Sequence, residues 1–134
     1  MSDDRGMGMD KNKTETYYIL FEKMINSMTS GVKFDRREFV EILDEICELF
    51  HISKGVTEFY TSLSKEKAGQ GEILIDRDNG RGDKVVVRRR LVTNTMAVII
   101  GTLYMAEEDE PLTNEEYLKV DLILRALLSY VSRN

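Results

Sequence analysis

The stretch from Met96 to Ala106 constrains the fold of this chain more than any other, because it is almost wholly apolar and carries no charged side chain. It is only about half as long as a helix that spans a bilayer. Glu107 to Pro111 then form an acidic turn, which ends the apolar run. We therefore expect residues 95–106 to be the central strand of a sheet, buried on both faces.

A helix with strong start signals follows the acidic turn. Thr113 and Glu116 have the spacing of a capping box, and no glycine or proline interrupts the sequence from there to Asn134. We therefore expect this helix to run to Asn134 without a stop signal. Its apolar residues exceed what one sheet can cover, so part of it should face another helix, of this chain or of a partner. The residues expected to form this dimer and relay helix are Leu118, Leu122, Leu124, Leu128 and Val131.

Two further helices are expected near the start of the chain, after a flexible leader over residues 1–13. Apolar residues, Ile25 among them, recur at helical spacing over residues 14–28. A stronger apolar stripe runs from Phe39 to Phe50, and Asp35 and Glu38 before it stand in the first and fourth places of a capping box.

Three more strands are expected, at residues 56–63, 73–75 and 85–92, with a loop over residues 65–71. Asn79-Gly80 suits a type I′ bend, after which residues 85–92 would form the returning strand. The expected fold is α+β: an antiparallel sheet of four strands in two hairpins, with the N-terminal and C-terminal helices packed on one face.

Length and composition indicate a single globular domain over residues 14–134. The net charge of −5 argues against general nucleic-acid binding, because affinity for phosphate rests on clustered lysine and arginine. Cys47 is the only cysteine, which excludes an internal disulfide and a thiolate metal cluster. No apolar run reaches membrane-spanning length, and the leader lacks the apolar core of a signal peptide, so we expect a cytoplasmic protein without a membrane partner.

The order of the elements and the closing pattern resemble a GAF domain, the small sensor module of bacterial signalling proteins. The run Gly101-Thr102-Leu103-Tyr104-Met105 is similar to the family's central-strand pattern of glycine, any residue, leucine, any residue and an apolar residue. Leu112 to Glu116, followed by the stripe of Val120, Leu124 and Leu127, is similar to the family's closing helix. The resemblance covers residues 14–132.

The resemblance implies regulation and dimerisation more than a particular ligand. GAF domains that hold a cyclic nucleotide, haem or tetrapyrrole insert long loops and helices among their strands, and residues 55–106 are too few for such an insertion, so no cofactor is expected. In such proteins the last helix often continues into an output domain, frequently a GGDEF domain that makes cyclic di-GMP. We therefore expect a non-catalytic sensory domain of a bacterial signalling protein, acting as a homodimer through its C-terminal helix.

The run from Arg88 to Arg90 is the main basic cluster, and two interpretations of it remain open. Strand alternation places Arg88 and Arg90 on one side and Arg89 on the other, with Val85, Val87 and Leu91. The cluster could bind an anion such as a nucleotide phosphate or a carboxylate. It could instead protect an edge strand by its charge.

Tyr60 and Tyr104 could line a small pocket near these arginines, or they could simply pack in the core. If both the pocket and the anion site exist, the alternative function is a sensor of an anionic small molecule that binds Arg88, Arg89, Arg90, Tyr60 and Tyr104.

No residue set in the sequence predicts catalysis or a metal centre. Cys47 and His51 are one helical turn apart, but no oxyanion donors or third group accompany them, so we expect a structural thiol and a helix-terminal histidine. The three aspartates between residues 76 and 83 do not fit the EF-hand pattern and indicate a solvated turn. The acidic run at residues 107–110 is expected to be solvated as well.

Overall fold

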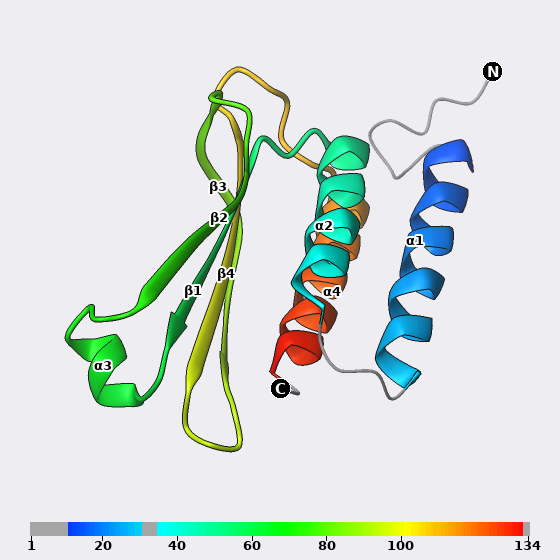
Figure 1. The fold of residues 1–134 in the computed structure, drawn as a ribbon. Coiled ribbons are helices and arrows are strands. Elements are labelled where there is room, and N and C mark those ends of the chain that lie inside the picture. Colours follow the sequence, from blue (N-terminus) through cyan, green and yellow to red (C-terminus); the bar gives the residue numbers. More distant parts are fainter. Residues whose placement is uncertain (1–10, 31–34, 133–134) are drawn as a thin grey trace.

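The computed structural model describes residues 11–30 and 35–132 as an α+β fold with a four-stranded antiparallel sheet. The elements are α1 (Lys11–Thr29), α2 (Arg36–Phe50), β1 (Lys54–Tyr60), α3 (Leu63–Lys67), β2 (Glu72–Asp78), β3 (Gly82–Val92), β4 (Val98–Ala106) and α4 (Asn114–Val131). The sheet, the pair α2 and α4, and then α1 form successive layers (Figure 1), whereas the short α3 lies on the opposite side of the sheet. The predicted α+β class is confirmed.

Two hairpins build the sheet, and β1 and β4 join them. The strand order is β2-β1-β4-β3, and every neighbouring pair is antiparallel. The seam between the hairpins sets Thr57 of β1 opposite Gly101 of β4. Every β4 side chain is buried except that of Tyr104, which is partly exposed. The predicted central strand, buried on both faces, is therefore confirmed over residues 98–106, whereas residues 95–97 belong to the preceding turn and Met96 is 53% exposed.

The turn at Asn79 and Gly80 is not the expected hairpin bend. β2 and β3 lie at opposite edges of the sheet, so this turn connects the two hairpins instead of closing one. A type I′ bend needs a positive φ at both central residues; Gly80 has a φ of 81°, but Asn79 is not among the described residues with positive φ. The Asn79 amide donates to the Ser53 carbonyl at 3.0 Å, which ties the turn to the start of β1.

A helix replaces the end of the predicted first strand and part of the predicted loop. β1 stops at Tyr60, and α3 begins at Leu63. The reason is a local cap: the Ser62 hydroxyl accepts a hydrogen bond from the Lys65 amide at 3.2 Å, which satisfies an amide in the first turn of α3. The alternation of polar and apolar residues up to Leu63 therefore overstated the length of the strand.

A bulge in β3 changes which valines face the helices. Alternation predicts Val85 on the same side as Val87, yet Val87 is 3% exposed and Val85 is 54% exposed. The pairing of β3 with β4 shifts between these two residues. The extra residue of a bulge reverses the alternation at that point, which turns Val85 to solvent.

Of the two residues in the predicted capping box of α2, only Asp35 caps the helix. The Asp35 side chain caps α2 by accepting from the Arg37 amide at 2.9 Å. The Glu38 carboxylate accepts from the hydroxyls of Ser27 and Tyr130, so Asp35 caps α2 while Glu38 serves contacts between helices.

The predicted capping box of α4 is confirmed. The Thr113 hydroxyl accepts from the Glu116 amide at 3.2 Å, and the Glu116 carboxylate accepts from the Thr113 amide at 3.0 Å. At the other end, the Ser132 amide donates to Leu128 and caps the helix after Val131, short of the predicted Asn134. Residues 133 and 134 lie outside the described residues.

The boundary of the predicted leader is also corrected, because α1 begins at Lys11; residues 1–10 lie outside the described part of the chain. Within residues 11–30 and 35–132, no helix combines the length and the apolar character that crossing a membrane requires.

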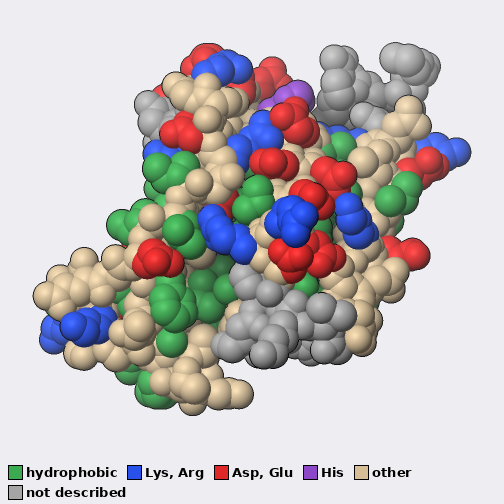
Figure 2. Space-filling view, in the orientation of Figure 1, with side chains coloured by type: hydrophobic (Ala, Val, Ile, Leu, Met, Phe, Trp, Pro, Cys, Tyr) green, Lys and Arg blue, Asp and Glu red, His purple; other side chains and the backbone are tan. Residues whose placement is uncertain are grey.

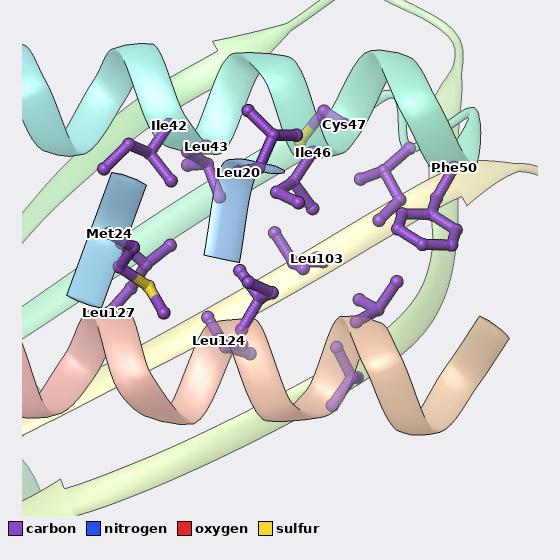
Figure 3. Close-up of a cluster of buried hydrophobic side chains, with 14 of the residues drawn as sticks. Leu20, Met24, Ile42, Leu43, Ile46, Cys47, Phe50, Leu103, Leu124 and Leu127 are labelled. Atoms are coloured by element: carbon purple, nitrogen blue, oxygen red, sulfur yellow. The ribbon is translucent and has the colours of Figure 1, made fainter. Parts of the chain in front are cut away.

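The main core fills the space between the sheet and the three long helices (Figure 3). Its labelled side chains come from α1 (Leu20, Met24), α2 (Ile42, Leu43, Ile46, Cys47, Phe50), β4 (Leu103) and α4 (Leu124, Leu127). Gly101 of β4 lets α4 approach closely, since a Cβ there would lie 2.9 Å from Leu124 Cδ1. A smaller cluster of Tyr60, Val98 and Ile100 forms apart from this core.

Candidate functional site

Strand β3 carries two of the predicted arginines on the outer face of the sheet, which is the face turned away from α2 and α4. There, Arg88 Nη2 lies 3.6 Å from a carboxylate oxygen of Glu58. Arg90 makes a two-pronged contact with Glu66 of α3, with both N···O distances 2.7 Å. The hydrogen bond from Arg90 lowers the pKa of the Glu66 carboxyl. An anion that binds these guanidinium groups must therefore compete with Glu58 and Glu66.

Arg89 points to the other side of the sheet, as alternation predicts, and contacts α4. Its Nε lies 2.7 Å from Asp121 Oδ1, and its Nη2 donates to the Tyr117 hydroxyl at 3.1 Å. The other oxygen of Asp121 accepts from Arg125 Nε at 3.1 Å. Asp121 is only 8% exposed, so this pair is less screened by solvent than a surface ion pair. The contact links β3 directly to α4.

The two predicted pocket tyrosines lie on the same outer face as Arg88. Tyr60 is 7% exposed, and its hydroxyl donates to Glu58 Oε1 at 2.6 Å. Tyr104 pairs across the strands with Lys54, whose ammonium lies 5.4 Å from the centre of the tyrosine ring. The structure thus gathers four of the five predicted ligand residues on one face and places Arg89 on the other.

A polar cleft of about 330 Å³ lies at the carboxyl end of α2, and Cys47, His51 and Arg77 contribute to its wall. Burial raises the pKa of the Cys47 thiol to about 12, which keeps it protonated and weakly nucleophilic. His51 has a φ of 58° and caps α2, because its amide donates to the Cys47 carbonyl. No group of three potential metal ligands occurs among residues 11–30 and 35–132.

The acidic run after β4 is mostly exposed, and two of its residues contact basic side chains. Glu108 and Asp109 lie 2.7 Å and 3.6 Å from Arg81 Nη2, and Lys84 donates to the Asp109 carbonyl at 3.2 Å. These contacts connect the acidic turn to the start of β3. They neutralise part of the run, but Glu107, Glu108 and Glu110 are exposed, as predicted, and only Asp109 is partly buried.

The closing helix exposes two leucines on one side, here called the α4 face. Leu118 is 63% exposed and Leu122 is 50% exposed, one helical turn apart. Of the other residues predicted for the relay helix, Leu124 and Leu128 are buried at 3% and 2%, and Val131 is partly buried. Those side chains pack inside the chain, where α4 contacts the sheet, α1 and α2.

Helix α1 borders the α4 face. Lys119 of α4 donates to the Tyr18 hydroxyl at 3.1 Å, and its ammonium lies 4.7 Å from the centre of that ring. Tyr18 is nevertheless 54% exposed. Ile25, two turns further along the same side of α1, is 36% exposed, although the sequence pattern places it in the core.

The side of the molecule that carries α2 has a different character. In Figure 2, lysine, arginine, aspartate and glutamate side chains crowd the centre of this side, while hydrophobic side chains gather at the left. Along α2, Asp44 and Glu48 pair with Arg77 of β2 at 3.6 Å and 2.7 Å. The part of this surface along α2 is therefore neutralised by internal ion pairs.

The chain matches no protein-family model, no curated protein and no solved structure. Three features of the described residues bear on function. They are an exposed apolar face on α4, a polar link between that helix and β3, and ion-paired arginines on the outer face.

The sequence pattern does not reveal the acidic partners of Arg88 and Arg90, although it favours one contact of Arg125. Asp121 precedes Arg125 by four residues, a spacing that favours a contact on a helix, so this pair had a local signal. Glu58 and Glu66 lie far from Arg88 and Arg90 in the sequence, and only the folded sheet brings them together.

Proposed function

We propose that this chain is a non-catalytic, GAF-like sensory or regulatory domain of a bacterial signalling protein. It pairs with a second copy through the α4 face and acts through α4 on an output domain. The observation that carries this proposal is the exposure of Leu118 and Leu122 on a helix whose other apolar side chains are mostly buried. The packing of α1, α2 and α4 on one side of an antiparallel sheet supports the GAF-like part of the proposal.

The link between β3 and α4 supplies a route for regulation. Arg88 and Arg90 contact carboxylates on the outer face, while Arg89 between them contacts Asp121 on α4. A ligand or partner that shifts β3 at its edge of the sheet would also move Arg89, which contacts Asp121 on α4. A ligand shifts the balance between two states of a domain only if it binds the two states with different affinity.

Burial of the two exposed leucines would strengthen association of two copies, against the entropy cost of bringing them together. Full burial of a leucine contributes about 1.5–3 kcal/mol, so covering the exposed part of each contributes roughly 1 kcal/mol. Two leucines from each copy then contribute about 4 kcal/mol, which corresponds to a factor of about 1000 in the dissociation constant.

Sedimentation over a concentration series tests the proposal with the double variant Leu118→Gln/Leu122→Gln. Glutamine keeps the helix propensity and approximate size but removes the apolar contact. We expect the wild-type protein to dimerise and the double variant to be monomeric at the same concentrations. Ile19→Gln is the matched control, because Ile19 is 68% exposed on α1 and lines a different groove, beside Glu22 and Glu38. A wild-type monomer at high micromolar concentration, or equal weakening by the control, contradicts the proposal.

A second candidate function is a sensor of a small anionic molecule. The observation in its favour is that Arg90 already holds a carboxylate through two hydrogen bonds of 2.7 Å, the geometry in which arginine binds carboxylate or phosphate ligands. Thermal-shift measurements with nucleotides and organic acids test it. A shift that disappears in Arg88→Gln/Arg90→Gln supports a sensor, and the lack of a shift at saturating concentrations leaves pairing as the function.

A further inference from the structure

One side of α4, on which Leu118, Leu122 and Arg125 are exposed and Glu115 is partly exposed, is self-complementary along its length. Glu115, Leu118, Leu122 and Arg125 fall within an arc of about 80° when projected down an α-helix. The Arg125 side chain is 62% exposed, and its contact with Asp121 uses only Nε. The face therefore reads acidic, apolar, apolar and basic from its amino end to its carboxyl end.

These four positions are symmetric about Val120, which lies between the two leucines. A second α4 that runs in the opposite direction, with its Val120 level with the first, sets Leu118 beside the second copy's Leu122. The same register sets Glu115 beside the second copy's Arg125. Two copies running in the same direction would instead set glutamate beside glutamate and arginine beside arginine, which is unfavourable.

We propose that two copies of this chain pair through an antiparallel, two-fold contact of their α4 helices, with the two-fold axis level with the buried Val120. This inference rests on the proposed pairing and adds its direction and register. In a two-fold contact each residue pair occurs twice, so both leucine contacts and both Glu115–Arg125 contacts form in one interface. The carboxyl ends of the two α4 helices then lie at opposite ends of the contact.

Crosslinking tests the register. In a Cys47→Ala background, one protein carries Glu115→Cys and a size tag, and a second carries Arg125→Cys without the tag. The probe is a short bismaleimide, because packed helices lie about 8–10 Å apart. The antiparallel register predicts crosslinked product in the mixture and loss of product when either protein is treated alone. Crosslinking within each protein alone shows a parallel register and overturns the inference, while the proposed pairing stands.

Charge variants without cysteines give an independent measurement of the same register. Glu115→Arg alone places arginine beside arginine in the antiparallel contact and should weaken the dimer, and Glu115→Arg/Arg125→Glu should restore it. A single variant that dimerises as well as wild type overturns the register. Circular dichroism of each variant identifies any loss of folding, and Glu115→Arg alone suffices if the double variant does not fold.

Sedimentation of the wild-type protein separates the two proposals. A monomeric wild type overturns both the pairing and the register. A dimeric wild type with no crosslinked product in any mixture places α4 outside the interface, which overturns the register and the α4 face as the pairing surface. Crosslinking within each protein alone overturns the register only.

Discussion

Gly101 is the position where a single added carbon should do most damage to the packing of α4. It lies in the central strand, opposite Thr57, directly beneath α4. A Cβ at this position would lie 2.9 Å from Leu124 Cδ1 and 3.3 Å from Leu128 Cδ2. Both leucines are buried, so neither can swing out to solvent to make room. Gly101→Ala must therefore shift α4 or force its leucines out of their preferred rotamers.

The expected cost follows from two opposing effects. Overpacking a core by a methyl group costs about 1–3 kcal/mol. Replacing glycine by alanine restricts the unfolded chain, which stabilises the fold by about 0.4–1 kcal/mol where alanine can adopt the native backbone conformation. Gly101 is not among the described glycines with positive φ, so the second effect applies in full. We expect Gly101→Ala to lower the free energy of unfolding by about 1–2 kcal/mol in urea titrations, with little change in the m value.

A double-mutant cycle with Leu124→Ala separates crowding from other causes. Leu124→Ala alone should cost about 2–5 kcal/mol, because it leaves a cavity. Combined with Gly101→Ala it should cost less than the sum, since the new methyl group fills part of that cavity. The control is Gly80→Ala, where the cost comes from a φ of 81° with no atom within 4 Å, so its effect should add to that of Leu124→Ala. Wild-type stability in Gly101→Ala, or strict additivity with Leu124→Ala, would refute the assignment of crowding.

Two further predictions concern titratable groups. The Cys47 thiol, with its pKa raised to about 12 by burial, should resist alkylation at pH 8 in the folded protein and react at the rate of an ordinary thiol in urea; fast alkylation without denaturant contradicts its burial. Burial alone would raise the pKa of Glu116, but hydrogen bonds from Lys13 and the Thr113 amide outweigh burial and lower it. Because the folded pKa lies below the unfolded value, Glu116 stabilises the fold above the unfolded pKa, and this contribution is lost as the pH falls through the folded pKa. Glu116→Gln should therefore flatten the acid limb of stability against pH, and an unchanged limb contradicts this role.

The features that the sequence predicted correctly have local causes. The apolar residues of α2 recur at helical spacing, and Phe39, Ile42 and Ile46 are buried as that spacing requires. The uncharged run of β4 is buried on both faces, and Thr113 and Glu116 cap α4 within a single turn. In each case, the residues that determine the structure lie within a few positions of one another.

Features that depend on distant segments were not predictable in the same way. The sequence shows that Leu118, Leu122, Leu124 and Leu128 are all apolar, but it does not show which side of α4 the sheet, α1 and α2 occupy. The fold buries the last two and leaves the first two exposed. The absence of pairing between β2 and β3 has a similar cause, because strand order depends on how the two hairpins meet.

The seam between the hairpins also sets the order in which the sheet can assemble. Each hairpin joins strands that are neighbours in sequence, whereas Thr57 and Gly101 at the seam are 44 positions apart (101 − 57). The entropy lost in closing a loop grows with the length of the loop, and this loss precedes any gain from the contact. Leu103, which the core packs around, meets the side chains of α2 only once β4 lies beside β1. The slow step of folding should therefore be the joining of two preformed halves, and stopped-flow refolding should slow when residues of the seam are weakened but not when the tip of either hairpin is changed.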